Sequence, residues 1–156
     1  MLGRLKAAAV ALLPWKARRP STVTIDVVTE HPETGVFALI LVETGPWPSG
    51  SVEDELRRVQ TRLYDCVDVA VDGKLADLYP ESKGRSVRIQ LDTYDIPEQV
   101  VRPFFERFAN HVATWPEVQA AIKKNRNVES LALEYNPRII GDRGDEAQGG
   151  GCPTRR

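Results

Sequence analysis

The chain has 156 residues, of which 42% are hydrophobic and 28% charged, with a mean hydropathy of −0.33. These values are typical of one globular domain, which at this length needs no disulfide or metal to build a core. No run approaches the roughly 20 apolar residues of a membrane-spanning helix. The two cysteines, Cys66 and Cys152, are far apart and form no Cys-x-x-Cys motif. We therefore expect a cytoplasmic protein without a disulfide framework.

Charge is distributed unevenly along the chain. Residues 1–20 carry five basic and no acidic side chains, whereas residues 21–135 carry 12 Lys and Arg against 19 Asp and Glu, a difference of −7. An acidic body repels phosphate backbones. We therefore expect no nucleic-acid binding by the folded part.

The basic segment 1–20 has three interpretations. The favoured one is a disordered extension or a start codon assigned too early. The second is a short amphipathic helix, anchored by Trp15, that makes weak contact with an anionic membrane. The third is a secretory signal peptide, although basic residues stand where its cleavage site should be. The apolar face of the amphipathic helix would consist of Leu2, Leu5, Ala9 and Leu12.

Two strands open the body of the domain. From Thr22 onward, apolar residues alternate with Thr24 and Asp26, which predicts a strand with one solvated face. The second segment, 36–42, is apolar on both faces and follows a hairpin-like connection, which predicts a central, antiparallel strand. The apolar residues of the first strand are Val23, Ile25 and Val27.

A long helix should follow the break at residues 45–50. Ser51 is the expected N-cap, an apolar stripe extends to Ala70, and Gly73 ends the helix. The polar face of this helix should carry Arg57, Arg58, Arg62 and Asp65.

The second half of the body predicts another strand, two helices and a last strand. Val87, Ile89 and Leu91 alternate with polar residues, and a later strand, 131–135, ends at Asn136-Pro137. Asp95 is the expected cap of the next helix, which Pro103 should kink or restart. The sequence Thr114-Trp-Pro-Glu117 opens a further short helix. The buried stripe of the first of these helices should be Phe104, Phe105, Phe108 and Val112.

This order of elements predicts a two-layer α+β domain. Its sheet has four strands, mixed or antiparallel, with helices on one face in the order β-β-α-β-α-α-β. The domain should span residues 21–137, between the basic extension 1–20 and a disordered Gly-rich tail, 138–156. The order of the strands within the sheet does not follow from the sequence.

The residue types that bind metals or act as nucleophiles are sparse. His31 in a turn and His111 late in a helix have no partner at ligand spacing, so we expect no metal or other cofactor. Cys66 lies on the apolar face of the long helix and is expected in the core. The weak catalytic candidates are Asp92, Tyr94 and Asp95, at the end of the third strand.

Trp47 lies between Pro46 and Pro48 at a strand exit. It either folds back onto the domain as a plug or presents a stiff aromatic anchor to a partner. We therefore take Trp47, Pro46 and Pro48 as the candidate partner-binding residues.

Several turns and core positions together resemble a bacterial family of small single-domain proteins that is known only as a domain of unknown function. The resemblance spans about residues 25–135 and implies a shared fold, with no established functional residue. The positions that carry it are Ile25-Asp26, Glu43-Thr-Gly-Pro-Trp47, Leu56-x-x-Val-Gln60, Leu63-Tyr64, Gly73-Lys-Leu75, Tyr79-Pro80, Lys83-Gly84, Val87 to Leu91, Pro97 and Phe104-Phe105.

Two functions remain open on these grounds. The favoured hypothesis is a non-enzymatic regulatory or immunity-type module that binds another protein through the Trp47 loop and an acidic surface. The alternative is an enzyme or small-ligand binder that uses the Asp92, Tyr94 and Asp95 group.

Overall fold

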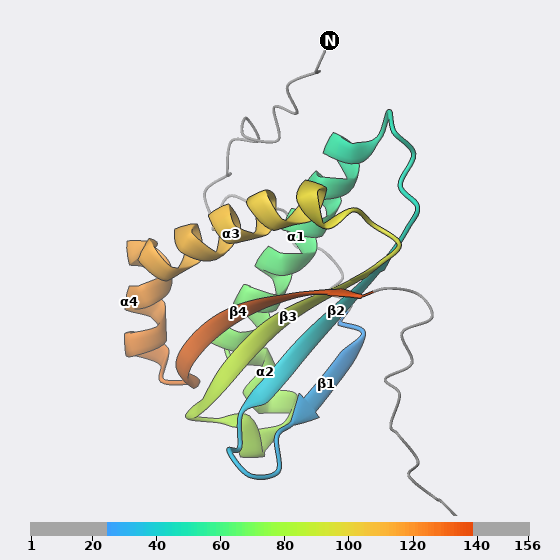
Figure 1. Cartoon of the computed structure of the whole chain (residues 1–156). Coiled ribbons are helices and arrows are strands. Elements are labelled where there is room, and N and C mark those ends of the chain that lie inside the picture. Colours follow the sequence, from blue (N-terminus) through green and yellow to red (C-terminus); the bar gives the residue numbers. More distant parts are fainter. Residues whose placement is uncertain (1–24, 139–156) are drawn as a thin grey trace, which may run out of the picture.

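A computed structural model describes residues 25–138 as a four-stranded sheet with helices packed against it (Figure 1). The strands lie in the order β1-β2-β3-β4. β1 is antiparallel to β2, whereas β2, β3 and β4 run parallel to one another. The strands are β1 (Val27–Glu30), β2 (Phe37–Thr44), β3 (Arg85–Tyr94) and β4 (Val128–Arg138).

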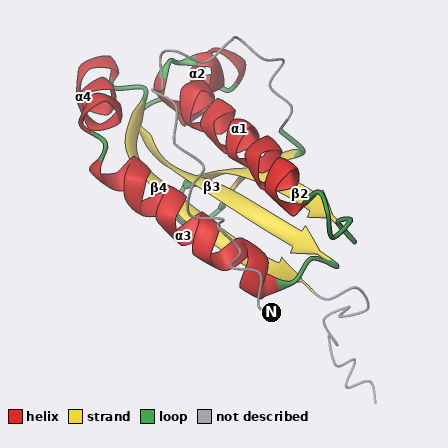
Figure 2. Ribbon diagram, turned by 90° about the horizontal axis from the view of Figure 1, so that it is seen from above, coloured by secondary structure: helices red, strands yellow, loops and turns green. Residues whose placement is uncertain are grey.

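The helices connect the parallel strands. Figure 2 shows α1 and α3 side by side on one face of the sheet. Strand order follows chain order, and right-handed crossovers that step across a sheet in one direction place their helices on the same face. The helices are α1 (Val52–Val71), α2 (Lys74–Leu78), the 3₁₀ turn η3 (Pro80–Ser82), α3 (Glu98–Thr114) and α4 (Pro116–Asn125).

The core lies between the sheet and α1 and α3. Alternate residues of β2 and β3, such as Leu39 and Ile89, are fully buried there against Leu63 of α1 and Phe108 of α3. The predicted α+β class with helices on one face is therefore confirmed. Among residues 25–138, no helix covers the opposite face of the sheet (Figures 1 and 2).

The predicted central strand is confirmed, but its pairing is mixed. β2 is antiparallel only to β1 and parallel to β3. The antiparallel prediction fails on the β3 side because the connection from β2 to β3 contains α1, a helix of 20 residues. This helix brings the chain back to the end of the sheet at which β2 starts, so β3 runs parallel to β2.

The first strand begins later than its alternation predicts, at Val27. Thr22 to Thr24 lie outside the described residues. Asp26 is exposed, as its assignment to a solvated face predicts, and its carboxylate also accepts a hydrogen bond from Arg62 of α1. Val27, predicted to be the inward residue, is 43% exposed.

α1 begins after Ser51 as predicted, but not through the predicted cap. The Ser51 hydroxyl donates to the Pro48 carbonyl rather than accepting from the helix. The expected polar face is also partly wrong, since Asp65 is buried and Arg62 is directed at the sheet. α1 is buried on more of its circumference than an amphipathic surface helix.

α3 begins at Glu98 with Pro97 in the N-cap position, so the Asp95 cap is wrong. Asp95 instead has a φ of +57° in the turn before the helix. Pro103 interrupts nothing, because the helix runs unbroken from 98 to 114. The carbonyl that Pro103 leaves without a donor belongs to Gln99, which is exposed to water. The predicted stripe containing Phe104 and Phe108 is confirmed.

β4 also extends further than predicted. It runs through Asn136 and Pro137 to Arg138, with Pro137 opposite Thr93. Proline is tolerated there because β4 is an edge strand among the described residues. The predicted extension 1–20 lies outside the described residues. Of the predicted tail 138–156, Arg138 belongs to β4 and the remainder, 139–156, lies outside the described residues. No helix between residues 25 and 138 is long and apolar enough to cross a membrane.

Candidate functional site

The two groups of candidate residues from the sequence meet at one end of the sheet. Because β2 and β3 are parallel and in register, Thr44 lies opposite Tyr94, and both strands end there. The Gly45 amide donates a 2.7 Å hydrogen bond to the Tyr94 carbonyl, which joins the segments that leave β2 and β3. In open sheets with parallel strands, binding sites form at the carboxyl ends of the strands. We call the loops 45–51 and 95–97 the carboxyl-end loops.

The two loops approach each other closely at Gly45. A Cβ atom at Gly45 would lie 2.0 Å from the Asp95 carbonyl oxygen and 3.0 Å from the Ile96 side chain. Asp95 turns the chain with a positive φ, which Asp tolerates better than most residues. Ile96 is buried below this turn. The absence of a side chain at Gly45 is therefore what allows the loops to pack together.

Trp47 folds back onto the domain. Its side chain is partly buried and packs against the hydrophobic core, which favours the plug interpretation. Its indole N–H is buried and has no hydrogen-bond partner among residues 25–138. Pro46 and Pro48, on either side, are exposed. The Pro48 carbonyl accepts hydrogen bonds from both the amide and the hydroxyl of Ser51. Trp47 thus holds the loop against the domain and Ser51 closes its turn, while the prolines face solvent.

Asp92, Tyr94 and Asp95 lie close together in the sequence but differ in their surroundings. Asp92 and Tyr94 project from the sheet face that no described helix covers, and Asp92 is buried there at 7% exposure. Its carboxylate accepts a hydrogen bond from Gln90. Asp95 is exposed in the following turn. Within residues 25–138, no hydrogen bond joins any two of these three side chains.

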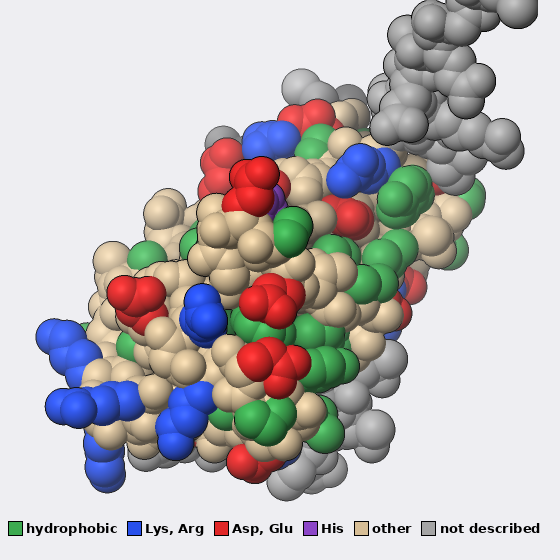
Figure 3. Space-filling model, turned by 90° about the horizontal axis from the view of Figure 1, so that it is seen from below, with side chains coloured by type: hydrophobic (Ala, Val, Ile, Leu, Met, Phe, Trp, Pro, Cys, Tyr) green, Lys and Arg blue, Asp and Glu red, His purple; other side chains and the backbone are tan. Residues whose placement is uncertain are grey.

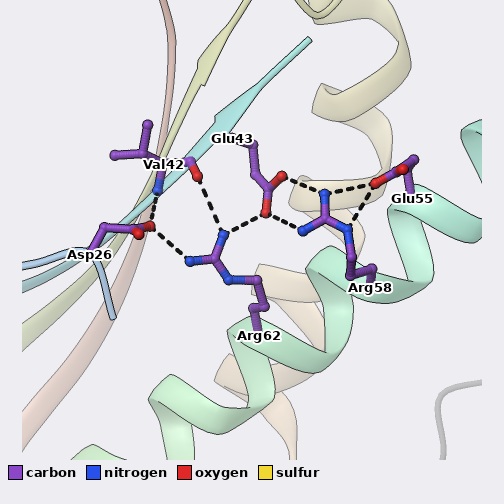
Figure 4. Close-up of polar contacts among 6 residues, drawn as sticks. All are labelled: Asp26, Val42, Glu43, Glu55, Arg58 and Arg62. Carbon is purple, nitrogen blue, oxygen red and sulfur yellow. Dashed lines mark hydrogen bonds and ion pairs between the residues drawn. The ribbon is translucent and has the colours of Figure 1, made fainter. Parts of the chain in front are cut away.

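The densest group of ionised side chains lies beside this end of the sheet (Figure 4). Glu43, near the end of β2, is 4% exposed and faces α1. Arg58 binds both of its carboxylate oxygens, at 2.9 and 2.6 Å. Arg62 donates to the same carboxylate at 2.6 Å and to Asp26 at 2.7 Å. Arg58 also pairs with Glu55 of its own helix.

This network also completes the edge of β2. β1 ends its pairing at Ile40, so the next outward-facing backbone groups of β2 are those of Val42. The Val42 amide donates to the Asp26 carboxylate at 2.7 Å, and the Val42 carbonyl accepts from Arg62 at 3.3 Å. Two side chains thus take the place of a neighbouring strand, which removes an exposed pairing edge.

The charges of the network stabilise one another. The hydrogen bonds that Arg58 donates to Glu43 raise the pKa of Arg58, although burial opposes this. Burial raises the pKa of Asp26, but the Val42 amide and Arg62 outweigh it and hold that pKa below its ordinary value. Because every member already has a partner, the network acts as a structural clamp between β1, β2 and α1.

Sequence reasoning did not find this network, although a signal was present. Glu43 continues the period-two pattern of Phe37, Leu39 and Leu41, so it had to face the helix layer. A carboxylate on that face requires a cationic partner. Arg58 and Arg62 are four residues apart on the following helix and were available.

The remaining candidates have structural roles. Cys66 is buried in the core, as predicted, and burial raises the pKa of its thiol to about 12. The His31 ring accepts hydrogen bonds from the Glu33 and Thr34 amides. His111 packs on Trp115 with ring centres 4.5 Å apart. No group of three or more His, Cys, Asp or Glu able to hold a metal occurs among residues 25–138.

Comparison with protein-family models, with curated proteins and with solved structures found no match to this chain. The resemblance to a bacterial family, stated from the sequence, therefore stays a prediction.

Proposed function

We propose that this chain is a non-enzymatic bacterial module that binds another protein with the carboxyl-end loops, in a regulatory or immunity-type role. The observation that carries the proposal is the backbone contact of Gly45 with Tyr94 and Asp95. It joins two separate loops into one surface. A surface fixed in advance loses little conformational entropy when a partner binds.

The exposed groups of this surface suit a protein partner. Pro46, Pro48 and Pro97 are exposed and have restricted backbones. Trp47, which lies between Pro46 and Pro48 in the sequence, packs against the core. Rigid apolar groups of this kind provide contact area without a large ordering cost.

The charge around the loops favours a basic partner. Both α1 and α3 begin at this end, and their first turns carry Glu53, Asp54, Glu55 and Glu98. Asp54 and Asp95 are exposed and form no ion pair with any other residue between 25 and 138. Exposed carboxylates accelerate association with a basic surface and make it sensitive to salt.

The proposal places the protein in the cytoplasm. Its buried Cys66 is a free thiol, which is compatible with a reducing compartment. Fractionation of the native cell, followed by detection of the chain, tests this placement.

Site-specific photo-cross-linking in the native cell tests the binding surface. A photoreactive amino acid replaces Pro48 in one variant and Glu106, exposed on the outer side of α3, in the control. We expect one discrete cross-linked protein from position 48 and none from position 106. Equal cross-linking from both positions, or none from position 48, contradicts the proposal.

Trp47→Ala and Trp47→Phe separate support from direct contact. If Trp47 only holds the loop, Phe should retain cross-linking at position 48, while Ala reduces both cross-linking and thermal stability. Loss of cross-linking in both variants, with unchanged melting temperature, would instead assign Trp47 to the contact itself.

A further inference from the structure

The two edges of the sheet differ in length and in protection. On one side the edge strand β1 has only 4 residues, and Asp26 and Arg62 bind the backbone of Val42 where β1 leaves β2 uncovered. Short edge strands and bound backbone groups both prevent pairing with another chain. On the other side β4 has 11 residues, and no described element lies beyond it in the sheet (Figure 1).

The register shows which backbone groups of β4 face away from the sheet. The Tyr94 carbonyl accepts from Gly45, so Tyr94 directs its backbone groups toward β2, and every second residue of β3 does the same. The residues between them, such as Ile89, therefore face β4. Ile89 lies opposite Leu133, and a parallel ladder uses the backbone of the two residues that flank such a partner. The residues of β4 that face outward are thus Leu131, Leu133 and Tyr135.

This outer edge is incompletely covered. Between residues 25 and 138, no group bonds to the outward amides and carbonyls of these three residues. The side chains of Leu131 and Leu133 point to the helix layer but are only half-buried, whereas Val87 and Ile89, opposite them on β3, are fully buried. Both the backbone and the apolar side chains of β4 can therefore gain from a further strand.

We propose that β4 pairs with β4 of a second copy of this chain, antiparallel and centred on Leu133, so that two sheets join into one of eight strands. In this register Leu133 lies opposite Leu133 of the second copy, and Leu131 lies opposite Tyr135. Apolar side chains then meet on the helix side of the joined sheet. The contact is isologous, because each copy donates and accepts the same hydrogen bonds.

The irregular ends of β4 favour this partner and this register. Near the start of the strand, Glu129 and Ser130 together lie opposite Ser86, which is a bulge that interrupts regular pairing. Near its end, Pro137 has no amide to donate. Positions 129 and 137 are equally distant from Leu133, so the bulge of one copy falls opposite the proline of the other. Residues 131–135, between the two interruptions, pair regularly.

The charges along the edge do not oppose the contact. Glu134 lies opposite Ala132 of the second copy and is already paired with Arg88 of its own copy at 3.4 Å. In this register no two residues of like charge face each other directly. Figure 3, which views the domain from the side opposite to Figure 2, shows acidic and basic side chains on the same side of the molecule. Joining two sheets edge to edge therefore collects no charge of one sign.

The dimer leaves the carboxyl-end loops free. A two-fold axis at Leu133 reverses the direction of the strands, so the loops of the two copies lie at opposite ends of the joined sheet. Each copy can then bind its own partner. Cross-linking from position 48 does not depend on the mass of the assembly, so the proposed function and the proposed dimer fail or succeed separately.

Light scattering after size-exclusion chromatography of the full chain, over a series of concentrations, tests the association. We expect a mass that rises with concentration from 17.4 kDa toward twice that value. A mass of 17.4 kDa at every concentration overturns the proposal. Slow amide hydrogen exchange at Leu133 in such a monomer would assign this edge to another part of the chain instead.

Cysteine cross-linking in the Cys152→Ser background tests the register, because the remaining Cys66 is buried. Residues that face each other in a hydrogen-bonded antiparallel pair have Cα atoms about 5.5 Å apart, which a disulfide spans. Leu133→Cys should therefore form a disulfide-linked dimer on mild oxidation. Leu131→Cys, the matched control, faces Tyr135 of the second copy and should form far less. Equal cross-linking of both variants, or none from position 133, contradicts the proposal.

A proline variant tests the backbone hydrogen bonds of the contact. Leu133→Pro removes the outward amide together with the leucine side chain, whereas Leu133→Ala removes only the side chain. Both should remain folded, as circular dichroism checks, because this amide takes no part in the ladder with β3. We expect Leu133→Pro to weaken the dimer about tenfold more than Leu133→Ala, since two symmetry-related hydrogen bonds are lost. Equal dimerisation of the two folded variants overturns the pairing.

Discussion

Substitution of Gly45 by alanine tests whether the carboxyl-end loops are truly in contact. The new Cβ would lie 2.0 Å from the Asp95 carbonyl oxygen and 2.8 Å from its carbon, whereas ordinary contact begins near 3.4 Å. Both atoms belong to the backbone, so no side-chain rotation relieves the overlap. The loops must therefore move apart by roughly 1 Å or more.

The cost follows from what this movement disrupts. The Gly45 amide is 2.7 Å from the Tyr94 carbonyl, so such a shift breaks or greatly weakens their hydrogen bond. Loss of that bond costs about 1 kcal/mol, and the overpacking about 1–3 kcal/mol more. Alanine recovers about 0.4–1 kcal/mol by restricting the unfolded chain. We expect a net loss of about 2–3 kcal/mol.

Thermal unfolding followed by circular dichroism measures this effect, with Gly50→Ala as the control. Gly50 lies in the same loop, and a Cβ there would meet nothing within 4 Å. We expect Gly45→Ala to lower the melting temperature by roughly 10 °C and Gly50→Ala to leave it unchanged or slightly raised. Equal melting temperatures of the two variants would refute the contact between the loops.

Three further predictions concern the ion network and the core. Glu43→Gln keeps the volume of the side chain but leaves Arg58 and Arg62 short of a buried partner, so unfolding in urea should show a loss of about 2–3 kcal/mol; a loss below about 0.5 kcal/mol contradicts the clamp. Because the pKa of Asp26 is lowered in the folded state, its stabilisation is full above the ordinary pKa and is lost as pH falls through the folded value. Asp26→Asn should therefore be less stable than the parent chain at pH 7, with the difference vanishing in acid; a difference independent of pH counts against the ionised pair. In the Cys152→Ser background, Cys66 should react with a disulfide reagent only after unfolding, because burial raises the pKa of its thiol to about 12; rapid reaction of the native protein would place it outside the core.

Local patterns predicted most of the elements because each is built from a face that must be buried. The stripe on α1 and the alternation in β3 have the periods of a helix and a strand, and both segments are buried on the predicted sides. The apolar run of residues 36–42 predicted the central place of β2. These signals concern a residue and its near neighbours, so they are visible without the fold.

Errors at the ends of elements arose where a distant contact outweighed a local preference. Asp95 has the side chain of a helix cap, but its backbone is held in a positive φ against Gly45, and the helix begins after Pro97. Asp26 is exposed, as the strand pattern predicts, but that pattern does not show that its carboxylate binds Arg62 and Val42. Neither partner is near in sequence, so no window of ordinary length contains the deciding contact.

The joining of the two candidate sites depended on strand direction. Trp47 and Asp92 are 45 positions apart, and in the sequence they belonged to rival hypotheses. They lie at the same end only because β2 and β3 are adjacent and parallel. An antiparallel pair would have placed the two strand exits at opposite ends.

The same parallel arrangement separates the connections at the two ends of the sheet. In β2, β3 and β4, every connection that leaves a strand begins at the carboxyl end, and every connection that returns to β3 or β4 arrives at the amino end. The Gly45 and Asp95 loops belong to the first group. Leu78 and Lys83, like the end of α4, belong to the second. A rigid sheet about eight residues long, or roughly 26 Å, holds the two groups apart. A partner at the carboxyl-end loops would therefore leave the side chains at the amino end of the sheet uncovered.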